Sequence, residues 1–256
     1  MPDDPARLRE LEANFAQALE REKLEAMAEF AAGAGHEINN PLTVIAGRAQ
    51  LLLRGETDPE RRHALALMNA QAMRVYEMIA DMMLFARPPQ PNFARFDAVK
   101  LIDAIVADLQ PPDARQDTVL TRIGLQEPLD VEADPTQLTV AIRALVQNAF
   151  EALVSGGSVQ VDVRSTAETL LIGVIDNGPG VSAEERRHIF DPFYSARQAG
   201  RGLGLGLSKC WRIVANHGGK VEVESAPGQG AKFTISLPIT PKKFQHGDTE
   251  DTEMQK

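Results

Sequence analysis

Residues 35–52 read Gly-His-Glu-Ile-Asn-Asn-Pro-Leu-Thr-Val-Ile-Ala-Gly-Arg-Ala-Gln-Leu-Leu. In this stretch apolar side chains recur at alternating intervals of four and three residues, at Ile38, Leu42, Ile45, Ala49 and Leu52. This heptad-like spacing predicts an amphipathic helix with one apolar seam. The helical pattern extends in both directions, over residues 6–54.

A second helix with a similar seam follows a short break at residues 55–59, where Thr57 or Asp58 can cap it. Pro59 fits its first turn, and the helix is expected to end near Arg87. Two such helices form an antiparallel hairpin, but one hairpin cannot bury two long seams. We therefore predict a homodimer, in which two hairpins make a four-helix bundle. The second seam contains Leu65, Met68, Ala72, Val75, Ile79 and Met82.

The prolines at 88, 89 and 91 end the hairpin and mark a domain boundary. Beyond it we expect helices over 99–109 and 138–153, and strands near 93–97, 119–125, 159–163, 170–174, 221–223 and 233–237. Interleaved helices and strands predict an α/β sandwich, so the fold class is α+β. The expected divisions are a helical lead-in (1–22), the hairpin (23–89), the sandwich (92–240) and a disordered polar tail (241–256).

Composition excludes several classes of protein. A net charge of −9 disfavours a broad surface for nucleic acid or for anionic membranes. The single cysteine, Cys210, rules out an intrachain disulfide. The acidic N-terminus lacks the apolar segment of a signal peptide, and no apolar run reaches the roughly 20 residues that span a bilayer. We expect a cytoplasmic protein without membrane insertion, in which a separate sensor protein or segment detects any external signal.

The helical periodicity places His36 on the exposed side of its helix, because it lies about 200° around from Ile38 on the seam. Asn40 is one turn further on the same face, and the neighbouring Glu37 can fix the imidazole tautomer while the other ring nitrogen attacks. Taken alone, an ordinary surface histidine is the simpler interpretation. The zinc motif His-Glu-x-x-His fits poorly, because Asn40 stands where the second metal ligand belongs.

Two glycine-rich stretches predict a nucleotide pocket. Asp176 ends an apolar strand ahead of Gly178 and Gly180, which suits recognition of an exocyclic amine such as that of adenine, although a plain turn is the alternative. Glycines at 200, 202, 204 and 206 precede a helix expected over 207–216, where backbone amides can bind phosphate; a flexible loop is the alternative. The spacing matches neither the dinucleotide fingerprint nor the P-loop.

Two more features accompany these stretches. Residues 181–201 form a long segment that can act as a lid over a ligand site. Asn148 lies on an apolar helix beside Gln147 and near Glu151. Its amide oxygen can hold a metal ion, or the side chain can be a satisfied core amide.

In this order and spacing, the chain resembles the sensor histidine kinases of two-component systems, and its second half resembles the wider GHKL ATPases. Residues 36–42 are similar to the H box and residues 147–152 to the N box. Asp176-x-Gly178-x-Gly180, residues 190–194 and residues 202–206 are similar to the first glycine box, the F box and the second glycine box.

The resemblance implies a dimerisation and phosphotransfer hairpin followed by an ATP-binding sandwich of the GHKL type. It implies that His36 accepts the γ-phosphoryl group of Mg-ATP, assisted by Glu37, and passes it to an aspartate of a response regulator. It also implies that Asn40 orients water for dephosphorylation of that regulator. Carried over by position, the ligands of ATP and Mg²⁺ are Asn148 for the metal, Asp176 for the adenine amine, and Gly202, Gly204 and Gly206 for the phosphates.

The sequence departs from the family at two positions. Ala144 stands where the N box often carries Asn or His, and Ser195-Ala196-Arg197 replaces the Thr-Lys that often follows the F box. Arg197 keeps a positive charge that can meet phosphate with a different geometry. Two other functional classes remain open: a GHKL ATPase that drives conformational change, and a phosphatase-biased scaffold without efficient autokinase activity.

Overall fold

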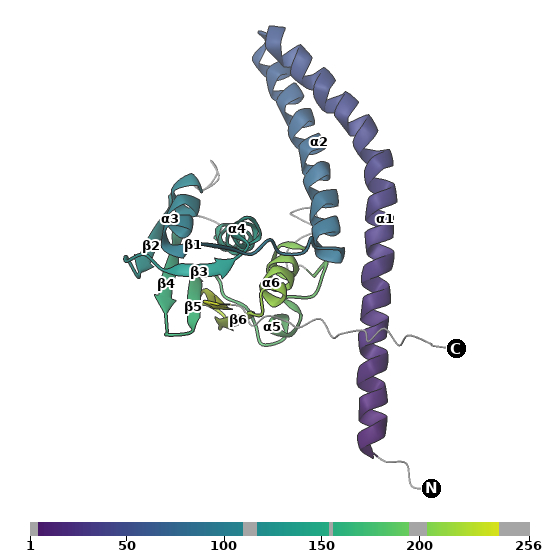
Figure 1. Cartoon of the computed structure of the whole chain (residues 1–256). Helices are drawn as coiled ribbons and strands as arrows, with labels where there is room; N and C mark the ends of the chain where they lie inside the picture. The colour runs from purple at the N-terminus through teal and green to yellow at the C-terminus, as the bar shows by residue number, and fades with distance from the viewer. Residues whose placement is uncertain (1–4, 110–116, 154–155, 195–203, 241–256) are drawn as a thin grey trace, which may run out of the picture.

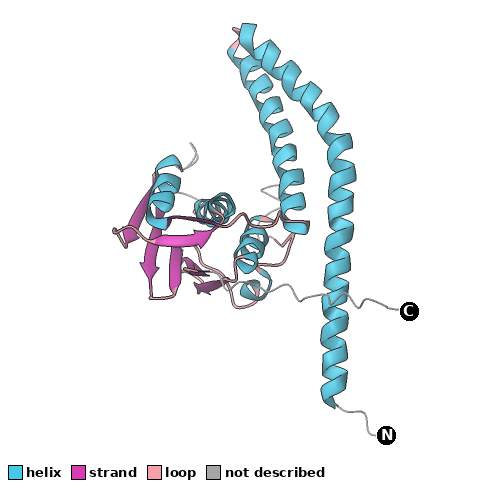
Figure 2. Cartoon of the chain, viewed as in Figure 1, coloured by secondary structure: helices cyan, strands magenta, loops and turns pink. Residues whose placement is uncertain are grey.

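The computed structural model describes residues 5–109, 117–153, 156–194 and 204–240. The chain consists of a long helical hairpin and an α/β unit that lies beside one end of it (Figure 1). Figure 2 shows that all strands belong to the second unit. The α+β fold class predicted from the sequence is confirmed.

The hairpin contains α1 (Pro5–Gly55) and α2 (Pro59–Ala86), close to the predicted bounds. Asp58 caps α2, because its Oδ1 accepts hydrogen bonds from the backbone N–H groups of Glu60 and Arg61, each at 3.0 Å. Arg62 stabilises the turn between α1 and α2, because its guanidinium donates to the carbonyl oxygens of Leu53 and Glu56. The helix α1 continues through Pro41, and Figure 1 shows it bending in the part that runs along α2.

The contact between α1 and α2 is made largely by small residues. The buried ones are Ala28, Ala31, Gly35, Ala46, Ala49 and Ala72. The predicted seams are therefore divided. Their alanines turn inward, whereas larger members stay exposed, such as Ile45 at 50% and Leu52 at 61%. A single hairpin thus leaves a row of large apolar side chains uncovered.

The second unit is built on a five-stranded sheet of order β2-β4-β5-β7-β6. These strands are β2 (Thr118–Gly124), β4 (Gly157–Ser165), β5 (Thr169–Asp176), β6 (Lys220–Ser225) and β7 (Ala231–Pro238). Strands β2 and β4 are parallel, and the other neighbours are antiparallel. A separate antiparallel pair joins β1 (Ala94–Asp97) to β3 (Asp130–Ala133).

One face of the sheet is covered by the helices α3 (Ala98–Asp108), α4 (Pro135–Ala152) and α6 (Gly206–Asn216). Alternate residues of the central strands point into this layer, which explains the period of two in the sequence. Each fully buried aliphatic or aromatic side chain contributes about 1.5–3 kcal/mol. The buried strand residues include Val159, Val161, Val163, Leu170, Ile172, Val174, Phe233, Ile235 and Leu237.

Two elements were not predicted. Strand β3 is only four residues long, and α5 (Glu185–His188) is a single turn inside the segment expected to be a loop. Elements this short carry too few residues to show a period. The expected disordered tail lies outside the described residues. Among the residues described, no helix combines the length and apolar character needed to cross a membrane.

The linker after the hairpin is bound to the α/β unit. Gln137 Nε2 donates to the carbonyl oxygen of Pro89 at 3.0 Å, and the backbone N–H of Asn92 donates to Asp134 Oδ2 at 2.8 Å. The ring of Phe93 packs on that of His217, with centroids 5.3 Å apart. Three contacts within five residues therefore fix the entry of the chain into this unit.

Asp134 is the centre of this attachment. Its Oδ1 also accepts from the N–H groups of Thr136 and Gln137 and so caps α4. Burial raises the pKa of the carboxyl, but the hydrogen bonds from Asn92, Gln137 and Thr136, with the nearby His217, outweigh burial and lower the pKa below its ordinary value. The ionised form is therefore the one that the fold stabilises.

Candidate functional site

The predicted phosphoacceptor region lies on α1, where His36, Glu37 and Asn40 are all exposed. The helices approach closely here, since a Cβ on Gly35 would lie 3.1 Å from Ile79 Cγ2. Successive positions of a helix do not face each other, so His36 and Glu37 point in different directions. Among the described residues, the ion pair of a histidine joins His188 to Asp191, and none joins His36 to Glu37. Assistance by Glu37 therefore remains a prediction.

Asp176 lies at the end of β5, where its buried carboxylate meets the first glycine turn. Its Oδ1 accepts a hydrogen bond from the N–H of Gly178 at 2.9 Å. A Cβ on Gly178 would lie 2.8 Å from that oxygen and 3.4 Å from Ala152 Cβ, at the end of α4. The carboxylate, the turn and the last turn of α4 are therefore in contact.

Gly180 has a backbone conformation that favours glycine. Its φ is +72°, and a Cβ there would overlap the carbonyl oxygen of Ala226 in the loop between β6 and β7. The first glycine stretch is thus constrained at its third position by packing as well as by backbone geometry.

Gly204 joins the second glycine stretch to the predicted lid. Its φ is +68°, and a Cβ would overlap the carbonyl oxygen of Tyr194. Phe193 next to it also has a positive φ of 64°. The chain before residue 195 therefore meets the chain after residue 203. Arg197 and Gly202 belong to that segment and lie outside the described residues.

The helix α6 begins at Gly206 without a side-chain cap, because no side chain at Leu205 accepts its first N–H groups. Unpaired backbone amides at a helix start, with the helix dipole behind them, favour a bound anion such as phosphate. A Cβ on Gly206 would meet none of the described residues within 4 Å, so they leave the approach to these amides open on that side.

Asn148 is half-buried on α4, one turn before the Ala152 that touches Gly178. Helix α4 packs directly against α6, so Asn148 and the open start of α6 lie on neighbouring helices. An amide oxygen is a ligand that Mg²⁺ accepts together with phosphate oxygens. The residues present therefore fit a nucleotide with its metal ion. Ala144 is buried in the same helix, where it packs in the core.

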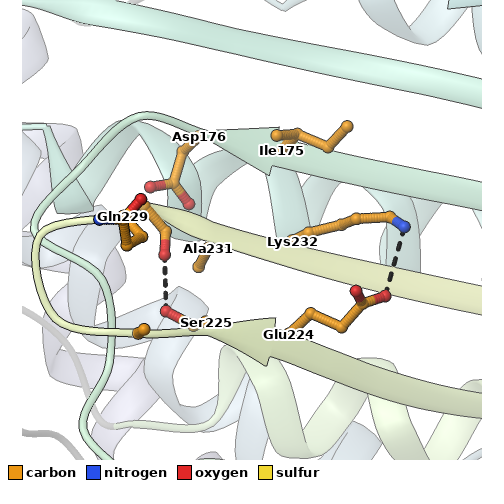
Figure 3. Close-up of a pocket in the computed structure, with 9 residues that line it drawn as sticks. Ile175, Asp176, Glu224, Ser225, Gln229, Ala231 and Lys232 are labelled. Atoms are coloured by element: carbon orange, nitrogen blue, oxygen red, sulfur yellow. Dashed lines mark hydrogen bonds and ion pairs between the residues drawn. The ribbon is translucent and has the colours of Figure 1, made fainter.

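A hollow of about 270 Å³ lies where β5 and β6 end and β7 begins, and Asp176 is among the residues that line it (Figure 3). It is lined by side chains such as Ile175 and Lys232, which point away from the helical layer. Lys232 Nζ pairs with Glu224 at 3.3 Å across it. Asp176 thus borders the hollow, but Asn148 and the start of α6 lie in the helical layer, so we do not assign the hollow to the phosphate end of the nucleotide.

The α/β unit docks on the end of the hairpin through residues that the sequence did not reveal. Leu205, next to the open start of α6, is buried with Leu24 of α1 and Phe85 of α2. Lys209 forms an ion pair with Asp81 beside them. His36 is twelve residues further along α1 than Leu24, about 18 Å along the axis. The phosphate end of the pocket is thus held away from His36 of its own chain.

Two family models match the chain. The His Kinase A (phospho-acceptor) domain matches residues 26–91, and the histidine kinase-, DNA gyrase B- and HSP90-like ATPase matches residues 133–241. Among curated relatives, the sensor histidine kinase ZraS of Klebsiella oxytoca is 34% identical over 224 residues, which are 86% of this chain and 47% of ZraS. The chain thus spans about half the length of the curated relatives it matches.

Solved structures that match the chain also include histidine kinases. Full-length ShkA in complex with AMPPNP matches with a TM-score of 0.71 and 26% identity, over 84% of this chain and 46% of ShkA. The catalytic domain of histidine kinase ThkA matches at 30% identity and a TM-score of 0.53, over 59% of this chain and 99% of that domain. ThkA in complex with the response regulator protein TrrA matches at 26% identity and a TM-score of 0.63, over 90% of this chain and 67% of ThkA.

Proposed function

The chain belongs to the sensor histidine kinase family, and on that premise we propose that it transfers the γ-phosphoryl group of Mg-ATP to His36 and from there to an aspartate of a response regulator. The observation that carries this proposal is the meeting of Asp176, the Gly178 turn and the last turn of α4, a helix that packs against α6 with its uncapped start. An exposed histidine on the accompanying hairpin completes the pair of sites that the reaction needs.

In this proposal each part of the pocket has one task. Asp176 orients the base by accepting from the adenine amine, and Asn148 offers its amide oxygen to Mg²⁺. The N–H groups that open α6 donate to phosphate oxygens, supported by Gly202, Gly204 and Gly206 and by the guanidinium of Arg197. ATP supplies the phosphoryl group when bound.

At the hairpin, a neutral ring nitrogen of His36 forms the new N–P bond while the bond to the ADP oxygen breaks and its electron pair leaves with ADP. The other ring nitrogen then loses its proton, and a carboxylate such as Glu37 is suited to receive it. Transfer to the regulator repeats the exchange, with an aspartate oxygen as acceptor. Asn40, one turn along the exposed face, orients water for hydrolysis of the regulator phosphate.

We also propose that the working unit is a homodimer built on the hairpin. The large apolar side chains left exposed on α1 and α2, such as Ile45 and Leu52, support it, because a second hairpin would remove them from water. Sedimentation analysis at micromolar concentration tests this arrangement. A monomer there would contradict it.

The complex of ThkA with TrrA supports a response regulator as the partner of this chain. The net charge of −9 favours a protein over a nucleic acid as the binding partner. We place the reaction in the cytoplasm, with detection of the signal assigned to a separate sensor protein or segment.

The direct experiment is incubation with γ-labelled ATP and Mg²⁺, beside the variant His36→Gln. We expect an acid-labile, alkali-stable label on the protein and none on His36→Gln, while a fluorescent ADP analogue binds both equally. Label that persists in His36→Gln would contradict the assignment of the acceptor. Nucleotide binding without any label would favour the ATPase or the phosphatase-biased scaffold.

A further inference from the structure

Tyr76 of α2 is hydrogen-bonded to the backbone of α1 directly beyond His36. Its hydroxyl donates to the carbonyl oxygen of Asn39 at 2.9 Å. Thr43 Oγ1 donates to the same carbonyl at 2.8 Å, and the two hydroxyls also touch each other. Each hydroxyl has one hydrogen and two lone pairs, so either can donate to Asn39 while the other donates to it. Three oxygens from two helices thus form one closed cluster.

This cluster lies at the weakest turn of α1. Pro41 has no N–H, so the carbonyl of Glu37 loses its helical hydrogen bond, and the proline ring pushes against the preceding turn. The affected turn carries Asn40 and begins directly after His36. Without an external support, a helix can bend to different extents at such a point. Tyr76 provides that support from the neighbouring helix.

The contact is specific to this level of the hairpin. Elsewhere the helices meet mainly through alanines, and at the adjacent level Gly35 lies against Ile79 at close range. A side chain that spans the gap with a hydroxyl therefore sets both the separation and the rotation of the helices beside His36. The hydroxyl of Tyr76 is part-buried, so loss of its hydrogen bond is not fully replaced by water.

We propose that Tyr76 is a positioning residue for the phosphotransfer reaction, which holds the Asn39–Thr43 turn and so fixes the direction of His36 and Asn40. The inference rests on the proposed function for its catalytic consequence, whereas its structural half stands on the hydrogen bonds alone. Its hydroxyl contacts Asn39 and Thr43, so its effect on the reaction passes through this turn.

The test compares Tyr76→Phe, which removes only the hydroxyl, with Thr43→Val and Thr43→Ser. We expect kcat for His36 labelling to fall roughly three- to tenfold in Tyr76→Phe and Thr43→Val, with KM for ATP unchanged, because the nucleotide pocket is on the other unit. Thr43→Ser keeps the hydroxyl and should stay near the wild type. The double variant Tyr76→Phe with Thr43→Val should lose little more kcat than either single variant. Both substitutions break the same hydrogen-bond cluster, so their effects do not add.

Arg62→Met is the matched control. Arg62 also donates from a side chain to backbone carbonyls of the hairpin, at Leu53 and Glu56, but at the opposite end from the α/β unit. We expect it to lower hairpin stability without lowering kcat. An equal loss of kcat in Arg62→Met, or wild-type kcat in Tyr76→Phe, would overturn the positioning role.

Amide hydrogen exchange separates this inference from the proposed function. Tyr76→Phe should speed exchange at Leu42 and Thr43 relative to the rest of α1, whether or not the protein takes a label. Unchanged exchange at Leu42 and Thr43 overturns the proposal that Tyr76 holds this turn. A wild-type protein that takes no label from Mg-ATP refutes the proposed function instead, and the exchange result still decides the structural half.

Discussion

The ion pair between Lys209 and Asp81 gives a quantitative prediction for the docked arrangement of the two units. The side chain of Lys209 is 12% exposed and that of Asp81 is 37% exposed, so the pair is neither a surface pair nor a fully buried one. Surface pairs contribute at most about 1 kcal/mol, and breaking a buried pair costs about 3–5 kcal/mol. For Asp81→Asn we expect a loss of about 1–2 kcal/mol, which lies between those limits.

A loss of this size shifts the docking equilibrium roughly 5- to 30-fold towards the released state, since each 1.4 kcal/mol is a factor of ten. Docking buries Leu205 against the hairpin and keeps the pocket away from His36 of the same chain. The initial rate of His36 labelling should therefore rise in Asp81→Asn, and the radius of gyration from small-angle scattering should increase.

Two variants control this experiment. Asp108→Asn removes the ion pair with Arg143 inside the α/β unit and should leave the labelling rate unchanged. Exchanging the charges in Asp81→Lys with Lys209→Asp should restore both the wild-type rate and the wild-type radius. A lower rate in Asp81→Asn, with the radius unchanged, would refute the view that this contact restrains the reaction.

Other predictions concern stability and chemistry. Gly180→Ala should lower the melting temperature by several degrees, because it combines a positive φ with an overlap at Ala226. Gly33→Ala should stabilise the hairpin by about 1 kcal/mol, because a Cβ there has open space around it. Thermal denaturation measures both effects. The lowered pKa of Asp134 gives stability that is present above its unfolded pKa and lost as the pH falls through the folded value. The stability advantage of the wild type over Asp134→Asn should therefore shrink below about pH 4 in urea titrations at several pH values. Burial raises the pKa of the Cys210 thiol to about 12, so a thiol reagent should react with it only on unfolding; fast reaction of the native protein would contradict its burial.

The elements that could be predicted are those with a sustained period. The helical pattern of residues 6–54 became α1, and the alternation at Leu170, Ile172 and Val174 became β5. Asp58 was one of two predicted caps, with Thr57, because a capping side chain acts on neighbouring amides, which is a local effect. Such features depend on residues within one element, so the sequence alone reveals them.

The parts that escaped prediction depend on contacts between distant residues. Nothing around Tyr76 marks it as the partner of Asn39, since the relevant contact is made across the hairpin. Asp81 and Lys209 are 128 positions apart, and each alone is an ordinary charged residue on a helix. Within the candidate site, motif order predicted Asp176 and Gly178, but only the folded chain showed that Ala152 lies against Gly178.

The bound linker has a mechanical consequence. Since Pro89 and Asn92 are held by Gln137 and Asp134, only Arg87 and Pro88 separate Ala86, the last residue of α2, from the bound segment. Two residues reach at most about 7 Å. Ile79, which is level with Gly35, is seven residues or about 10 Å back along α2. The α/β unit is therefore mounted on a short pivot. If it leaves the hairpin surface, the tether limits it to rotation about that end, which keeps the local concentration of the pocket around the acceptor high.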